Sequence, residues 1–147
     1  MAQLYPEATV GGLVVSGKGE ILLVRSWKWN DKFTVPGGHI ELGERAEDAV
    51  KREVKEETGL ELDSVELLLV QQAIYPEDYC KHEHFVFLDY VCRAKEDAEV
   101  RLDNRELQSY VWVNPEDALN LDMEEFTRAF VVKFISFKDG EYKPNYS

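Results

Sequence analysis

Residues 45–59, RAEDAVKREVKEETG, constrain the fold more than any other stretch of this chain. Their apolar residues recur at intervals of three and four, which predicts one amphipathic helix that ends at Gly59. At about 100° per residue, one sector of this helix collects Ala46, Ala49, Val50 and Val54. Because a helix with one apolar face must bury that face, the rest of the chain has to supply a surface that covers it.

Three glutamates are clustered in the C-terminal half of the same helix. Glu53 and Glu57 fall inside the apolar sector, and Glu56 lies at its edge. A buried carboxylate without a partner is costly, and the negative end of the helix dipole adds to the cost. Two compensations remain open: Arg52 pairs with Glu56 one turn further on, or a divalent cation binds several carboxylates. Because one arginine cannot neutralise three acids, the sequence favours the cation, for which hard oxygen ligands suit Mg²⁺ or Mn²⁺.

Apolar segments on both sides of the helix are typical of strands. Strands are expected at 8–16, 20–26, 65–75, 85–94 and 110–113, and a loop with a short strand is expected at 27–44. Helices are expected to begin at Asn114-Pro115 and to span 123–137, with a C-terminal tail at 137–147. This order predicts an α+β fold with a mixed sheet, built as a single domain over residues 1–147. The last helix carries phenylalanines that fit either the core or the face of a homodimer: Phe126, Phe130, Phe134 and Phe137.

The chain is acidic, with a net charge of −12 over 147 residues. Such a surface repels phosphate backbones, so binding of duplex nucleic acid is not expected, whereas a small anion can bind if local cations accompany it. The two cysteines imply no disulfide framework and fit a cytoplasmic compartment. No signal-peptide pattern and no apolar run near the ~20 residues of a membrane helix is found, so membrane association is not expected.

The loop before the helix and the helix itself together resemble a known motif. The residues that carry the resemblance are Gly38, Glu44, Arg52-Glu53-Val54, Glu56-Glu57 and Gly59-Leu60. Their spacing over residues 38–60 meets every fixed position of the Nudix box, the signature of the Nudix hydrolases. The segments on either side resemble MutT-like members of that family.

The resemblance implies an α/β/α sandwich with a mixed sheet and a loop–helix–loop catalytic motif. It also implies hydrolysis within the pyrophosphate of a nucleoside diphosphate derivative, with Mg²⁺ or Mn²⁺ as cofactor. Carried over by position, the metal ligands are the carboxylates of Glu53, Glu56 and Glu57 and the carbonyl of Gly38. In the same way, Arg52 orients the glutamates by ion pairing and Glu44 supports the loop.

The general base stays open among Glu53, Glu57 and Glu106, an acid that precedes the segment LQSYVWV. Substrate binding is assigned to Arg25, His39 and Trp29. For Arg25 the alternative is a solvated arginine at the end of a strand. For Trp29 the alternative is packing in the core.

Two substrate classes compete within the family. The segment VPGGHIELGE resembles members that cleave nucleoside triphosphates, including damaged ones, to the monophosphate and pyrophosphate, and this class is favoured. Pro76, sixteen residues after Leu60, resembles a marker of ADP-ribose pyrophosphatases, which are the alternative. A non-catalytic regulator that binds a nucleotide would be expected to have lost glutamates of the motif, and none is lost here.

Overall fold

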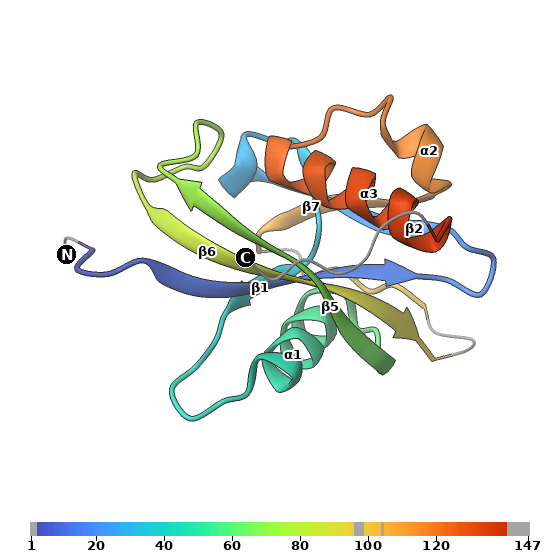
Figure 1. Ribbon diagram of the computed structural model, residues 1–147, viewed down its shortest axis with the longest axis horizontal. Coiled ribbons are helices and arrows are strands. Elements are labelled where there is room, and N and C mark those ends of the chain that lie inside the picture. The colour runs from blue at the N-terminus through green and yellow to red at the C-terminus, as the bar shows by residue number, and fades with distance from the viewer. Residues whose placement is uncertain (1–2, 96–98, 104, 141–147) are drawn as a thin grey trace.

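A computed structural model describes residues 3–95, 99–103 and 105–140, and within them a seven-stranded sheet carries helices on both faces (Figure 1). The strands are β1 (Glu7–Val15), β2 (Ile21–Ser26), β3 (Phe33–Thr34), β4 (Gly37–His39), β5 (Leu62–Ile74), β6 (His84–Ala94) and β7 (Leu107–Val113). The helices are α1 (Ala46–Thr58), α2 (Pro115–Ala118) and α3 (Glu125–Lys138), with a short 3₁₀ turn η1 (Trp27–Trp29) before β3.

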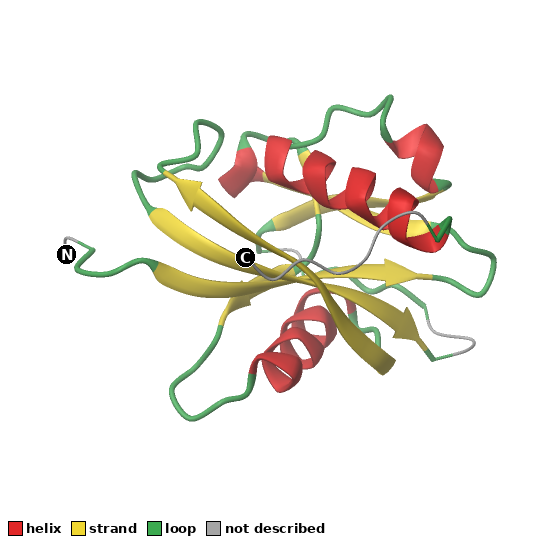
Figure 2. Cartoon of the chain, viewed as in Figure 1, coloured by secondary structure: helices red, strands yellow, loops and turns green. Residues whose placement is uncertain are grey.

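The sheet is mixed and has β1 near its centre. The strand order is β3-β2-β1-β6-β5, with β4 paired to β1 and β7 paired to β2. β1 and β6 run parallel, whereas the other pairs run antiparallel. α1 lies on one face, and α2 and α3 lie on the other, as the red helices around the yellow sheet show (Figure 2). The predicted α/β/α sandwich with a mixed sheet is confirmed.

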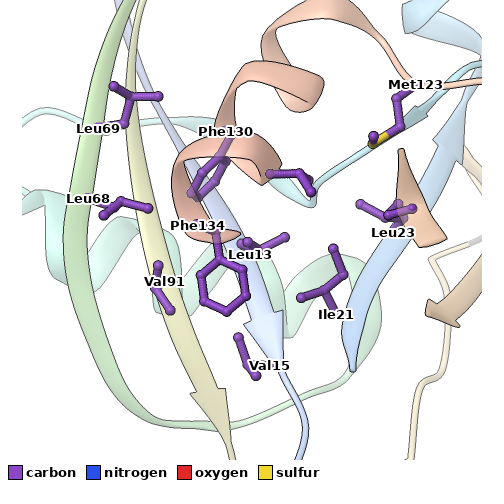
Figure 3. Close-up of a cluster of buried hydrophobic side chains, with 12 residues drawn as sticks. Leu13, Val15, Ile21, Leu23, Leu68, Leu69, Val91, Met123, Phe130 and Phe134 are labelled. Atoms are coloured by element: carbon purple, nitrogen blue, oxygen red, sulfur yellow. The ribbon is translucent and has the colours of Figure 1, made fainter. Parts of the chain in front are cut away.

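Each face of the sheet has its own apolar cluster. The cluster under α3 includes Leu13 of β1, Val91 of β6 and Phe130 of α3 (Figure 3). The cluster under α1 includes Val14 of β1 and Val54 of α1. Because helices cover both faces, the inner strands are apolar on both sides, as the buried ILLV run of β2 shows.

α1 begins and ends close to its predicted bounds. Gly59 follows the helix with a φ of 76°, and its N–H donates to the carbonyl of Lys55. This left-handed conformation is the one in which glycine most readily ends a helix. Val50 and Val54 are fully buried, and Lys51 and Lys55 on the opposite side are exposed. The predicted amphipathic face is therefore confirmed.

Two expectations need correction. The segment 27–44, expected as a loop with one short strand, contains both β3 and β4. α3 continues through Lys138, so the expected tail at 137–147 begins too early. Lys138 is held in the helix by an ion pair with Glu116 of α2, at 2.9 Å. Residues 141–147 lie outside the described part of the chain.

Candidate active site

A cleft of about 280 Å³ opens where β1 and β2 part, close in size to the smaller pockets, of ~300 Å³, that hold small molecules. The two strands are paired with each other only at Val15 and Ile21, beside the turn that joins them. Beyond this point β1 pairs with β4, and β2 pairs with β3. The cleft is lined from both sides, and its acidic lining residues near α1 are Glu41, Glu53, Glu57 and Glu106.

The three glutamates in the C-terminal half of α1 differ in exposure as the helix geometry predicts. Glu57 is buried, with 8% of its surface exposed. The side chain of Glu53 is 16% exposed and that of Glu56 is 58% exposed. Glu53 and Glu57 therefore share the buried side of α1 and face the cleft, whereas Glu56 is not among the residues that line it.

The glycines of β4 bring the backbone against these carboxylates. The N–H of Gly37 donates to Oε2 of Glu57 at 2.8 Å. A Cβ atom at Gly38 would lie 2.5 Å from Cδ of Glu53, which is closer than carbon atoms approach without a bond. Because β4 is paired to β1 along Thr9–Gly11, this segment cannot move away freely. The site therefore requires glycine at Gly38.

Arg52 holds several acids on the exposed side of the motif. Its guanidinium donates to both carboxylate oxygens of Glu44, at 2.8 and 2.9 Å. Nη1 also donates to Glu53 at 2.8 Å and to Glu56 at 3.3 Å, and Nη2 donates to the carbonyl of His39 at 3.0 Å. The Arg52–Glu56 pair expected from the sequence is present, but Glu57 receives no hydrogen bond from Arg52.

The pKa of Glu44 shifts in the opposite direction from the pKa values of Glu53 and Glu57, which line the cleft. The hydrogen bonds from Arg52 lower the pKa of Glu44 to about 2. Burial raises the pKa of Glu57 well above its ordinary value, and the charge of Glu53 adds to this rise. Burial also raises the pKa of Glu53, in spite of its bond to Arg52. The buried acids are therefore crowded and undercompensated.

The donor set fits a hard divalent cation in its chemistry. The carboxylates of α1 and the backbone of β4 are oxygen donors of the kind that Mg²⁺ and Mn²⁺ prefer. Within the described ranges, no three acidic, histidine or cysteine side chains are already arranged to hold a metal ion. Arg52 instead holds Glu53 and Glu56 through hydrogen bonds. Metal ligation by the four residues assigned from the motif therefore stays a prediction.

The three residues assigned to substrate binding are not brought together. His39 and Trp29 line the cleft, where His39 pairs with Glu7 and the Trp29 ring packs on aromatic neighbours. Arg25 is not among the lining residues. It is exposed on β2, where it donates to the carbonyl of Asp31 at 3.0 Å and lies over the ring of Phe33. This position favours the alternative of a solvated arginine at a strand end.

Sequence reasoning missed Lys28, which lies between the two tryptophans of η1. Within the part of the chain that the structure describes, Lys28 is the lysine or arginine that lines the cleft. Its ammonium group pairs with the carboxylate of Glu106 at 2.7 Å. The sequence signal is the segment WKW, in which a lysine lies between two aromatic residues. Lys28, and not Arg25, therefore places a positive charge in the cleft.

A second missed group lines the cleft on the side of α3. It is aromatic and polar, and it includes Phe87 and Asp89 of β6, Gln71 of β5, and Phe126 and Thr127 of α3. Asp89 could have been noticed in the sequence, because it interrupts the apolar strand HFVFLDYVC. The cleft therefore combines acids near α1 with a group of aromatic rings, which suits a ligand with a charged part and a ring.

The described residues contain no helix that is both long and apolar enough to cross a membrane.

Comparison with known proteins identifies relatives of the chain. A family model described as the NUDIX domain matches residues 6–134. The nucleoside triphosphatase NudI of Escherichia coli K12 is 31% identical over 103 residues, which cover 66% of this chain and 72% of that protein.

Solved structures show the same fold. The MutT NUDIX hydrolase from Burkholderia pseudomallei matches with a TM-score of 0.75 and 27% identity, over 88% of this chain and 98% of that one. The NUDIX domain of Shewanella oneidensis NrtR, complexed with ADP ribose, matches with a TM-score of 0.77 over 92% of this chain and 90% of that one. At 15% identity, this second likeness concerns the fold alone. With the complete motif at residues 38–60 and the sandwich around it, these matches show that the chain belongs to the Nudix hydrolase family.

Proposed function

We propose that this protein is a metal-dependent pyrophosphohydrolase that converts a ribo- or deoxyribonucleoside triphosphate and water into the monophosphate and pyrophosphate. The observation that carries the proposal is Glu57, a buried carboxylate without a basic partner among the described residues, in the same cleft as Glu53 and an aromatic wall. The nucleoside triphosphatase named among the relatives supports the choice of a triphosphate.

The residues that would hold Mg²⁺ or Mn²⁺ are Glu53, Glu56 and Glu57, together with the carbonyl of Gly38. When bound, such a cation offsets the charge of the phosphate groups and acidifies the attacking water. Arg52 keeps the carboxylates of Glu53 and Glu56 oriented through its hydrogen bonds at 2.8 and 3.3 Å.

The reaction also needs groups that accept a proton and offset charge. The water oxygen forms a bond to phosphorus, its proton passes to a carboxylate, and the bond to the departing pyrophosphate breaks. The candidate proton acceptors are Glu53, Glu57 and Glu106. All three line the cleft, so each can lie within reach of a water bound there. The ammonium group of Lys28, which pairs with Glu106 in this structure, would exchange that partner for a phosphate oxygen of the bound substrate.

A panel of ribo- and deoxyribonucleoside triphosphates and ADP-ribose, assayed with Mg²⁺ and with identification of the products, tests the proposal. We expect monophosphate and pyrophosphate from at least one triphosphate, released faster than ADP-ribose is cleaved. A clear preference for ADP-ribose would favour the alternative that Pro76 suggested. Saturable binding without any product would favour a non-catalytic regulator instead.

A further inference from the structure

Asp89 is a buried carboxylate that faces the cleft outside the glutamate motif. It is 5% exposed and lies on β6 beyond Phe85 and Phe87, on the same side of the strand. Gln71 donates to its Oδ2 at 2.9 Å. Its other oxygen, Oδ1, receives no hydrogen bond from the described residues. A buried carboxylate with one donor is costly, and a ligand that supplies a second donor would reduce that cost.

The backbone opposite Asp89 keeps this free oxygen accessible. Gly11 of β1 pairs in register with Asp89 and also lines the cleft. A Cβ atom at Gly11 would lie 3.1 Å from Oδ1 of Asp89 and 3.2 Å from a methyl group of Val35. Any side chain at this position would therefore crowd Oδ1, and glycine leaves the space beside it open.

The hydrogen-bond donors around Asp89 are already used. The side-chain amide of Gln71 donates to Asp89 and to the carbonyl of Phe126, at 2.9 and 2.8 Å, which uses both of its N–H groups. The hydroxyl of Thr127 donates to Glu124 at 3.1 Å, so the hydroxyl of Thr34 is the donor in their contact at 3.0 Å.

Burial raises the pKa of Asp89 to about 7, so above that pH its carboxylate is ionised and the atoms left over are hydrogen-bond acceptors. They are Oδ1 of Asp89, the amide oxygen of Gln71 and the hydroxyl oxygen of Thr34, all on residues that line the cleft. A ligand edge that donates hydrogen bonds complements such a wall, whereas an edge of carbonyl oxygens meets acceptors with acceptors.

Aromatic rings extend from this wall. Phe85 and Phe87 lie nearly parallel, with centroids 5.4 Å apart. Phe126 and Phe87 pack edge to face with centroids 5.6 Å apart, and the centroid of the Trp29 ring lies 6.0 Å from that of Phe87. A planar ring laid on this surface along β6 would reach Asp89 with one edge, because Asp89 is two residues beyond Phe87.

We propose that Asp89, supported by Gln71, determines which nucleobase the cleft accepts, and that it selects bases with an exocyclic amino group at the edge that meets it. Cytosine and adenine present an amino group where uracil and hypoxanthine present a carbonyl oxygen. The inference rests on the proposed nucleotide hydrolysis and adds to it the class of base.

Matched pairs of substrates isolate this one group. The kcat/KM values of CTP and UTP, and of ATP and ITP, are measured near pH 8.5, where Asp89 is ionised, with the parent and with Asp89→Asn, which keeps the size of the side chain. We expect the parent to favour the amino-bearing member of at least one pair by about tenfold or more, because the wrong edge leaves buried groups unpaired. Asp89→Asn, which can turn an amide donor toward the ligand, should lower that ratio by about tenfold. Asp63→Asn, exposed on β5, is the matched control and should leave the ratio unchanged.

Gly11→Ala is a second variant that keeps the charge of Asp89 and narrows the access to Oδ1. It should lower the same ratio, which keeps the proposal testable if Asp89→Asn does not fold. Equal ratios in the parent and in the variant that folds, or a parent that favours UTP and ITP, would overturn the proposal.

Binding without metal separates this inference from the proposed activity. The dissociation constants of CMP, UMP, AMP and IMP are measured by calorimetry with EDTA present. Amino-selective binding that Asp89→Asn removes supports the inference even if no triphosphate is cleaved. Hydrolysis of triphosphates without base preference, and without selective binding, would leave the activity standing and the role of Asp89 refuted.

Discussion

Position 57 carries a carboxylate that the fold alone would not favour. Glu57 is buried, accepts one backbone hydrogen bond from Gly37, and has no ion-pair partner among the described residues. Its neighbour Glu53, by contrast, is paired with Arg52. An isolated buried charge is usually less stable than a neutral side chain of the same size. The charge at this position is therefore best explained by a ligand that it binds.

Glu57→Gln tests this explanation through two measurements with opposite expected signs. Turnover at saturating Mg²⁺ should fall by about two orders of magnitude or more, because charge compensation at the diphosphate is the main catalytic effect. Burial raises the folded-state pKa of Glu57 above 4.5, so the parent loses stability as the pH rises from about that value toward the raised pKa. The metal-free melting temperature of the variant should therefore match that of the parent near pH 4 and equal or exceed it near pH 8.

Glu47→Gln is the control for this variant. Glu47 lies in the first turn of α1, half-exposed and outside the cleft, and its ion pair with Arg45 is long at 3.8 Å. Neither turnover nor melting temperature should change by much. If Glu57→Gln kept near-parental turnover, the buried side of α1 would not belong to the active site.

At the scale of elements, the two adjacent glycines of β4 lie against different neighbours. Gly37 lies against the backbone of β1, and Gly38 lies against the side chain of Glu53 in α1. A Cβ at Gly37 would lie 2.1 Å from the carbonyl oxygen of Val10, which is backbone, whereas a Cβ at Gly38 would meet the end of the Glu53 side chain. Gly37→Ala should therefore lower stability by roughly 1–3 kcal/mol or more. Gly38→Ala should displace Glu53 and lower turnover strongly, with a smaller loss of stability. Melting temperatures and kcat values of both variants check this, and equal effects on stability and turnover in the two variants would contradict it.

Local patterns explain which elements could be predicted. α1 was predictable because its period and its terminal glycine are local features. β3 and β4 span two and three residues, too few to show a period, and their pairing depends on β2 and β1. The spacing of residues also does not show that Lys28 of η1 lines the cleft or that Arg25 lies outside it, because both positions depend on how distant strands pair. Asp89 was detectable as a polar interruption, but its free oxygen depends on Gly11 across the sheet.

At the scale of the whole molecule, the proposed function requires an acidic protein to bind a polyanion. The chain has a net charge of −12, and its cleft contains Glu53, Glu57 and Glu106 with Lys28 as their basic neighbour. The field of such a protein opposes a triphosphate unless cations accompany it. Divalent cations bound by the glutamates of the motif, as proposed, would resolve this conflict and would also supply the catalytic charge. A homodimer stays a prediction, although Phe130 and Phe134, which suggested it, are used in the core.

The most direct measurement is the rate of pyrophosphate release from the best triphosphate substrate after complete chelation of divalent cations. With EDTA in excess, we expect no release above background, and addition of Mg²⁺ or Mn²⁺ beyond the chelator should restore the full rate. Glu47→Gln should behave like the parent under both conditions. A chelated sample that kept its full rate would contradict the assignment of the buried glutamates of α1 to a catalytic metal.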